Sequence, residues 1–404
     1  MFQLIKIAYR DLNSNRRRSL LTALAIGLGV GLLVIMSGII EGEIQDSLDA
    51  SIRLQSGHLQ IRDASFKEDR LSLIWDDLLP DSQAWIERLQ NNNEVQVATP
   101  ILWSSGIISI HAESANVKVS GIDPMSLAYS PFRNGLVAGE FITSDDRNGI
   151  LIGKRLADSL GITAGQEVNL VVSTSNGEPD EARFTIRGVY NTGFPGIDET
   201  TIFMPLSKAQ AFTRTEGHVS TIFVLLKDRA MADAIAETLR TAEVSFLTWR
   251  KFNELMLQTM NMADTYIYIF YLIVLAVAAT VIVNTLLMAV FERTREIGIL
   301  AAIGMKSREI MAMFLLQAGL LGIAGTLFGI VIGTLGVAYF VKNGIFIGDI
   351  GTTGMLFGER IYARFTINET IYISLIGLVT TLLAGFYPAS LAARMEPTEA
   401  LRSD

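Results

Sequence analysis

The chain has 404 residues, of which 50% are hydrophobic and only 18% are charged, and its formal net charge is −8. Soluble domains average about 25% charged residues, so this balance argues against a wholly soluble protein. The acidic balance gives no general electrostatic reason to bind nucleic acid, and the absence of cysteine excludes a disulfide framework, a thiolate metal site and a cysteine nucleophile.

The first predicted elements are an amphipathic segment at residues 1–18 and a membrane span at residues 19–40. The segment is rich in Lys and Arg and has the single acidic residue Asp11, so the positive-inside rule predicts a cytoplasmic N-terminus. The span is longer than the ~7–15 residues of a signal-peptide core, and no A-x-A-like cleavage site follows it. We therefore predict an uncleaved anchor.

Residues 41–264 are predicted to form a large extracytoplasmic domain. Stretches rich in β-branched residues with partial alternation predict strands at 57–61, 96–103, 106–111, 117–120, 167–173, 184–190 and 220–226. Helical patterns are found at 81–90, 154–160, 205–212 and 229–241. The domain is therefore predicted to be mixed α/β.

Helical patterns also flank this domain on both sides. Apolar residues recur at helical spacing, namely Ile44, Leu48 and Ile52 after the first span, and Leu255, Met256 and Met260 before the second. These segments either continue the spans outward as a stalk or are ordinary amphipathic helices of the domain.

Three further spans are predicted at 265–291, 310–341 and 370–393, because each run lacks charged residues and exceeds the ~20 residues that cross a bilayer. The loop 292–309 is basic and is predicted to be cytoplasmic. The remaining parts are an extracytoplasmic loop at 342–369 and a cytoplasmic tail at 394–404. The predicted fold class is therefore a membrane protein of four transmembrane helices, with the α/β domain inserted between the first and second.

The third span carries Gly325, Gly329 and Gly333 at the spacing that lets helices approach closely. Such a stripe packs either against another helix of the same chain or against a second membrane subunit.

The sequence shows no catalytic or metal-binding motif. His58, His111 and His218 are scattered without metal-ligand spacing. The run 149–155 is not a P-loop, because three residues rather than four separate its glycines and Arg155 stands where Ser or Thr is needed. We expect no catalytic, cofactor-binding or metal-binding residue in this chain, which is predicted not to be an enzyme.

The loop 292–309 is the most specific stretch of the sequence. It combines charged residues with a small apolar patch around Ile297, Ile299, Leu300 and Ile303, and Gly298 and Gly304 are predicted to be its hinges. An exposed apolar patch in a short loop indicates a binding partner. The alternative is a basic loop that lies against the membrane surface.

This loop resembles the cytoplasmic segment of the FtsX-like permease superfamily, the four-span subunits of MacB-type and lipoprotein-releasing ABC transporters. The C-terminal run 387–402 is similar to the ending of that family, and segment 149–171 resembles its extracytoplasmic domain. The order of one span, a large outside domain and three spans resembles the family over the whole chain.

The resemblance implies a permease of the inner membrane that pairs with a second permease copy, as a homodimer or heterodimer, among membrane lipids. A separate ABC ATPase dimer would bind ATP and Mg and drive the stalks and the outside domain. The residues that the resemblance assigns to ATPase coupling are Arg293, Arg295, Glu296, Ile297, Gly298, Ile299, Leu300 and Gly304.

Lipoprotein release or export is the leading function that the resemblance implies, with a lipoprotein as substrate. The alternatives are MacB-like efflux of peptides or amphiphilic drugs with a periplasmic adaptor, and FtsX-like signalling to an outside enzyme.

Overall fold

The computed structural model describes residues 2–66, 73–241, 243–348 and 358–396, and the chain divides into two compact units. The helical unit comprises Met1–Ile44, Thr259–Ile345 and Ile361–Asp404. The α/β unit comprises Gln45–Gln258 and Phe346–Arg360.

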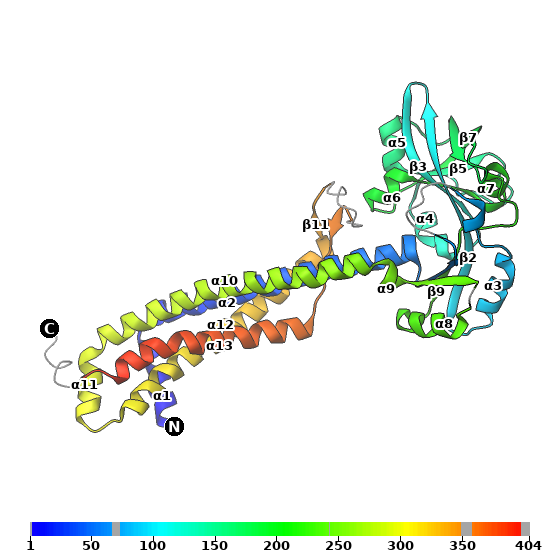
Figure 1. The fold of residues 1–404 in the computed structure, drawn as a ribbon. Helices are drawn as coiled ribbons and strands as arrows, with labels where there is room; N and C mark the ends of the chain where they lie inside the picture. The colour runs from blue at the N-terminus through cyan, green and yellow to red at the C-terminus, as the bar shows by residue number, and fades with distance from the viewer. Residues whose placement is uncertain (1, 67–72, 242, 349–357, 397–404) are drawn as a thin grey trace. The chain divides into compact units, whose positions relative to one another are not determined.

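Long helices dominate the helical unit (Figure 1). Its helices are α1 (Phe2–Ser14), α2 (Arg16–Ser51), α10 (Glu254–Glu292), α11 (Thr294–Ala302), α12 (Ser307–Asn343) and α13 (Ile367–Ala393). Of the described helices, α2, α10, α12 and α13 are long and apolar enough to cross a membrane. Each contains one of the predicted spans. At 1.5 Å per residue, the 36 residues of α2 reach about 54 Å, well beyond a hydrocarbon core of about 30 Å.

The glycine stripe of α12 packs against α2 of the same chain. A Cβ atom on Gly329 would lie 2.7 Å from the carbonyl oxygen of Gly27 and 2.8 Å from Cβ of Val30. Gly325 and Gly333 meet α2 equally closely, one turn to either side. Close backbone approach therefore requires glycine at these positions, and the structure assigns the stripe to packing within the chain.

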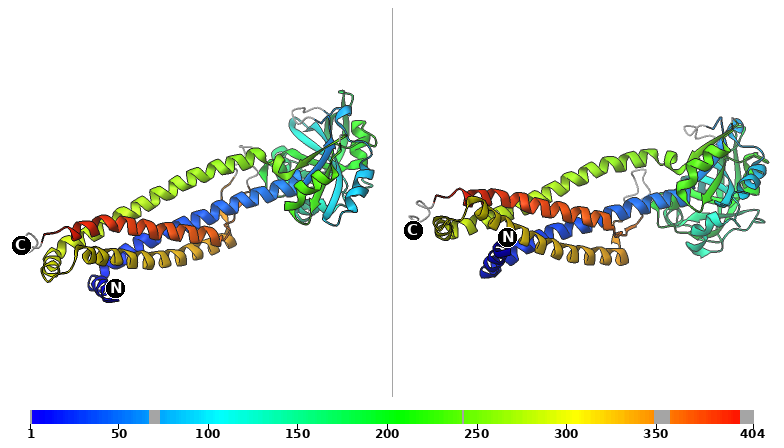
Figure 2. Two further views of the ribbon diagram at one scale, coloured as in Figure 1. Left: turned by 60° about the horizontal axis from the view of Figure 1, so that its bottom comes forward. Right: turned by 90° about the horizontal axis from the view of Figure 1, so that it is seen from below.

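Helix α13 covers another side of α12, and the two helices lie side by side in both views of Figure 2. Gly322 of α12 faces Thr381, and Gly385 of α13 faces Ala318. Buried aliphatic residues of α2, α10, α12 and α13 join in one apolar core, which includes Val30, Leu275, Leu321 and Ile373.

The α/β unit is built on a ten-stranded mixed sheet. The strands are β1 (Leu59–Asp63), β2 (Val95–Ile110), β3 (Glu113–Ile122), β4 (Leu136–Gly139), β5 (Gly149–Gly153), β6 (Glu167–Ser173), β7 (Pro179–Tyr190), β8 (Thr201–Pro205), β9 (Thr221–Leu226) and β10 (Val244–Thr248). Their order is β10-β1-β9-β2-β3-β8-β5-β7-β4, and β6 pairs with both β2 and β7. The predicted fold class, four spans with an α/β domain after the first, is confirmed.

Short helices connect these strands (Figure 1). They are α3 (Ser82–Gln90), α4 (Ser130–Asn134), α5 (Lys154–Leu160), α6 (Pro195–Thr200), α7 (Leu206–Thr213), α8 (Ala232–Leu239) and α9 (Trp249–Phe252). In the predicted loop 342–369, β11 (Ile345–Phe346) pairs with β12 (Arg360–Ile361), while residues 349–357 lie outside the described residues, as does most of the predicted tail 394–404.

Strand β2 differs from the prediction because it is one long strand rather than two. One of its edges pairs with β9 over Val95–Ile101 and then with β6 over Gly106–Ser109, while β3 occupies the other edge. The residues between these two pairings, 102–105, lie where β2 changes its neighbour. Trp103 N donates there to Oγ of Ser220 at 2.9 Å, and Oγ of Ser104 donates to the carbonyl oxygen of Ser173 at 2.8 Å.

Candidate functional site

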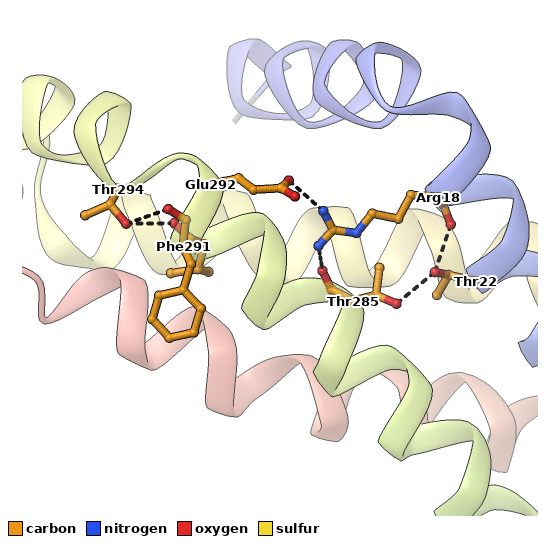
Figure 3. Close-up of polar contacts among 7 residues, drawn as sticks. Arg18, Thr22, Thr285, Phe291, Glu292 and Thr294 are labelled. Atoms are coloured by element: carbon orange, nitrogen blue, oxygen red, sulfur yellow. Dashed lines mark hydrogen bonds and ion pairs between the residues drawn. The ribbon is translucent and has the colours of Figure 1, made fainter. Parts of the chain in front are cut away.

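The predicted coupling loop 292–309 is mostly helical in the structure. Helix α11 begins after Arg293, where Oγ1 of Thr294 donates to the carbonyl oxygen of Phe291 at 2.9 Å (Figure 3). It is followed by Gly304, whose φ of +104° favours glycine and lets the chain turn toward α12. The amide of Lys306 then donates to Oε2 of Glu309 at 2.9 Å and helps to begin α12.

One face of α11 is buried in the helical unit. Ile297 is 2% exposed and belongs to an apolar cluster with Val290, Phe314 and Ala389. Gly298 is also buried and lies inside the helix. The prediction that Ile297 forms part of an exposed patch and that Gly298 is a hinge is therefore wrong, because both residues pack within the chain.

The opposite face of α11 is open. Arg295 and Glu296 are exposed, Ile299 is 43% exposed and Ile303, just beyond the helix, is 80% exposed. Their spacing of three or four residues places Glu296, Ile299 and Ile303 on a common face. Leu300 is half-buried beside them. The exposed surface of Arg295, Glu296, Ile299 and Ile303, called the coupling surface below, combines charge with apolar area.

Arg293 anchors the base of α11 to the N-terminal helix. Its Nη1 lies 2.6 Å from Oδ2 of Asp11 in α1, and both side chains are less than one-fifth exposed. Nε2 of Gln317 in α12 donates to the same carboxylate oxygen at 3.0 Å. Asp11 therefore joins α1, the start of α11 and α12, and Arg293 has a partner inside the chain.

A second polar contact ties the start of α2 to the end of α10 (Figure 3). Nη1 of Arg18 lies 2.7 Å from Oε2 of Glu292, and Nη2 of Arg18 donates to the carbonyl oxygen of Thr285. Oγ1 of Thr22 donates to Oγ1 of Thr285 at 3.0 Å. The sequence analysis predicted neither these contacts nor the ion pair of Asp11 with Arg293. Asp11 nevertheless stands out in the sequence as the single acidic residue of the basic N-terminal segment.

The predicted stalk residues lie on α2 and α10 and on the short π-helix Ile52–Ser56 that follows α2. Leu48 is 5% exposed and Ile52 is 2% exposed, and both belong to the apolar core of the α/β unit together with Trp249. Leu255 is 77% exposed, so it does not share a buried stripe with Met256. The remaining two stalk positions, Ile44 and Met260, are half-buried.

These segments are joined to each other inside the α/β unit. Oγ of Ser51 donates to Oδ1 of Asn253 at 2.6 Å, and Nδ2 of Asn253 donates to the carbonyl oxygen of Trp249 at 2.8 Å. Nη1 of Arg229 lies 3.2 Å from Oδ1 of Asp49 on α2. The segments are therefore built into the domain, and α2 and α10 continue from it as unbroken helices.

His58 and His218 contact other groups of the chain, while His111 is exposed in the turn between β2 and β3. Nδ1 of His58 accepts a hydrogen bond of 2.8 Å from the amide of Leu226, and burial together with the charge of Arg229 lowers the pKa of His58. His218 lies with its ring centroid 4.3 Å from that of Trp75. The described part of the chain contains no group of three or more His, Asp or Glu side chains that could hold a metal ion.

Two family models match the chain. The model of the MacB-like periplasmic core domain matches residues 19–242, and the model of the FtsX-like permease C-terminal region matches residues 268–397. The first match spans most of α2 and the α/β unit as far as α8, and the second spans most of α10 and all of α12 and α13.

Relatives of nearly equal length are similar over the whole chain. The lipoprotein-releasing system transmembrane protein LolC of Neisseria meningitidis is 24% identical over 93% of this chain and 92% of that protein. LolE of Haemophilus influenzae is 23% identical over 95% of this chain and 93% of that protein. The probable export ATP-binding/permease protein MacB of Pseudomonas entomophila is 27% identical over 99% of this chain, which spans 58% of that longer protein.

Proposed function

This chain belongs to the family of FtsX-like permeases with a MacB-like periplasmic core domain, and from that membership we propose that it is the permease subunit of an ABC transporter that releases or exports lipoproteins. The choice of substrate rests on the similarity of this chain to lipoprotein-releasing permeases, which extends over nearly the full length of this chain and of each of those relatives. The sequence contains no P-loop, so we assign the binding of ATP and Mg to a separate ATPase dimer.

The coupling surface on α11 is the proposed docking point of the ATPase. Ile299 and Ile303 supply apolar area for the centre of an interface, and Arg295 and Glu296 supply the charged rim. Arg293 acts indirectly, because its ion pair with Asp11 fixes the start of the helix that carries this surface.

Helices α2 and α10 are the proposed route by which motion reaches the α/β unit. Coupling between distant sites requires a stiff physical element with two arrangements. Both helices run without a break from the helical unit into the α/β unit.

The proposed orientation places both termini and α11 in the cytoplasm and the α/β unit outside, in the inner membrane. The basic N-terminal segment supports it. Because the chain has no cysteine, single variants can be labelled in intact cells with an impermeant maleimide. Asn176→Cys, in an exposed turn, should be labelled and Ser307→Cys protected; the reverse pattern would overturn the orientation.

The function itself is tested by reconstitution. We expect liposomes that contain this permease, its partner permease and the ATPase to release a triacylated lipoprotein when ATP is added, and to retain it with a non-hydrolysable analogue. ATP-dependent extrusion of an amphiphilic drug in the presence of a periplasmic adaptor, without lipoprotein release, would favour MacB-like efflux instead. ATP-dependent activation of an outside enzyme without either transport would favour signalling.

A further inference from the structure

The α/β unit contains a groove at the point where β2 changes its neighbour. Strands β9 and β6 both pair with the same edge of β2, but neither pairs with residues 102–105. No described strand pairs with these four residues on that edge, and a groove lies beside them. The groove has a volume of about 870 Å³, which is within the roughly 300–1,000 Å³ of small-molecule sites.

The walls of this groove are mainly apolar. Leu73, Ile74 and Leu78 line it, together with Val171 and Val172 of β6. Ile107 of β2 also lines it and is 46% exposed. An apolar ligand that covers this exposed isoleucine removes apolar surface from water, which contributes favourably to the free energy of binding.

A lysine lies on the floor of the groove. Lys118 of β3 stands opposite Ser105 of β2, and its Nζ lies 4.2 Å from the ring centroid of Trp103. The side chain is accessible from the groove, and within the described ranges no hydrogen bond or ion pair engages its ammonium group. The enclosing walls and the nearby charge of Arg62 lower the pKa of Lys118 to about 8, so the ammonium form still prevails at pH 7.

The charges around this lysine favour an anionic ligand. The guanidinium of Arg62 lies 5.5 Å from the ring of Trp103, so two cations share one aromatic side chain at the floor of the groove. The acidic residue Asp77 also lines the groove, but it already has a partner within the chain, and Oγ of Ser65 lies 3.5 Å from its Oδ1. An anion beside Lys118 would supply the counter-charge that the described residues do not give it.

We propose that this groove binds a single-chain amphiphile with an anionic headgroup. The headgroup pairs with Lys118, and the acyl chain lies along the wall formed by Leu73, Ile74 and Val171. The site is separate from the coupling surface and needs no ATP, so it goes beyond the transport function proposed above.

The test uses the full-length chain in lipid nanodiscs and follows tryptophan fluorescence. The probe is dibromostearate, whose bromine atoms quench nearby indole rings, and its uncharged methyl ester is the control ligand. We expect saturable quenching by the acid, and loss of most of it in Trp103→Phe. Quenching that rises without saturation, or equally with the ester, would show simple partitioning into the bilayer and overturn the proposal.

Variants of the lysine isolate the role of charge. Lys118→Met should weaken binding of the acid tenfold or more, whereas Lys118→Arg should bind within about threefold of wild type. Lys208→Met is the matched control, because Lys208 also lies over an aromatic ring, that of Phe184, but does not line the groove. Unchanged affinity in a well-folded Lys118→Met would overturn the proposal. Displacement of the probe by an acidic peptide that has no acyl chain would reassign the groove to a peptide ligand.

Discussion

Arg293 at the base of α11 pairs with Asp11 of α1 at 2.6 Å, although the two residues lie far apart in the sequence. Both are mostly buried, and Gln317 donates to the same carboxylate oxygen. We expect Arg293→Gln to leave the carboxylate without its charged partner and to destabilise the helical unit by about 1.5–3 kcal/mol. Thermal unfolding of the purified chain measures this loss.

A double-mutant cycle separates this ion pair from general damage. Asp11→Asn combined with Arg293→Gln should cost clearly less than the sum of the two single variants, since each single change already breaks the same contact. Additive losses would mean that the two side chains do not interact in solution.

The exposed and buried faces of α11 predict different effects for two neighbouring isoleucines. Ile299→Asp places a charge in the proposed ATPase interface and should abolish co-purification of the ATPase without changing the thermal stability of the free permease. Ile297→Ala should instead destabilise the permease by about 2–5 kcal/mol, because it leaves a cavity in a buried cluster.

Ser307→Asp serves as the control for Ile299→Asp, because it adds the same charge at an exposed position of the first turn of α12. It should leave ATPase binding intact. If Ile299→Asp recovered as much ATPase as the wild type, the ATPase would not dock on the coupling surface.

Local sequence patterns predicted two elements to the residue. Strand β6 and helix α5 have the predicted bounds, because alternation and helical spacing are properties of the segment itself. Strand β5 was missed, since it is only five residues long and its three apolar residues lie between two glycines without alternation. Strands β4, β8 and β10 were also missed, and they are only four or five residues long.

Contacts between distant segments were beyond sequence reasoning. The apolar pattern around Ile297 and Ile299 predicted a single exposed patch, and only the packing against Phe314 shows that Ile297 is buried while Ile299 is exposed. In the same way, the glycine spacing of α12 predicted a close helix contact but not that its partner is α2. The pairing of Arg18 with Glu292 depends on how α2 and α10 meet.

The contact between α12 and α2 predicts a position-dependent effect of alanine. Gly329→Ala brings a methyl group within 2.7 Å of a backbone oxygen of α2 and should destabilise the chain by about 1–3 kcal/mol. Gly319→Ala lies on the same helix, but its Cβ would meet only the side chain of Leu382 at 3.5 Å. It should be neutral or slightly stabilising, because alanine favours helix more than glycine does. Equal unfolding temperatures for the two variants would contradict the close contact.

The buried carboxyl group of Asp198 in α6 is expected to make the stability of the chain depend on pH. Its side chain is 2% exposed, and burial raises its pKa to about 6 although Thr192 donates two hydrogen bonds to it. Between the ordinary pKa of 3.8 and about 6, the folded chain binds more protons than the unfolded chain. Stability should therefore fall by roughly 3 kcal/mol as the pH rises through this range and then level off.

Comparison of two variants isolates this carboxyl group from the others. Asp198→Asn should remove that part of the pH dependence, as measured by unfolding temperature at pH 4 to 7, while Asp145→Asn, at an exposed carboxylate, should keep the wild-type profile. A profile unchanged by Asp198→Asn would place its pKa in the ordinary range.

The last prediction concerns the helices proposed to carry motion. Leu48 is a poor position for a test, because it lies in the core of the α/β unit and its replacement would damage that fold. Gln258 of α10 is exposed, and its side chain contacts only Glu254, one turn earlier, at 3.2 Å among the contacts recorded for the described chain. Proline there removes a backbone hydrogen bond and clashes with the preceding turn, at a local cost of about 3 kcal/mol or more.

If α10 transmits motion, Gln258→Pro should assemble with the ATPase and hydrolyse ATP but fail to release substrate, whereas Gln258→Ala should behave as wild type in all three assays. Assembly is measured by co-purification and folding by thermal unfolding, so that a misfolded variant is recognised. Normal release by a well-assembled Gln258→Pro complex would show that α10 need not be rigid at this point. Motion would then have to reach the α/β unit through α2, whose last turn is hydrogen-bonded to Asn253 through Ser51.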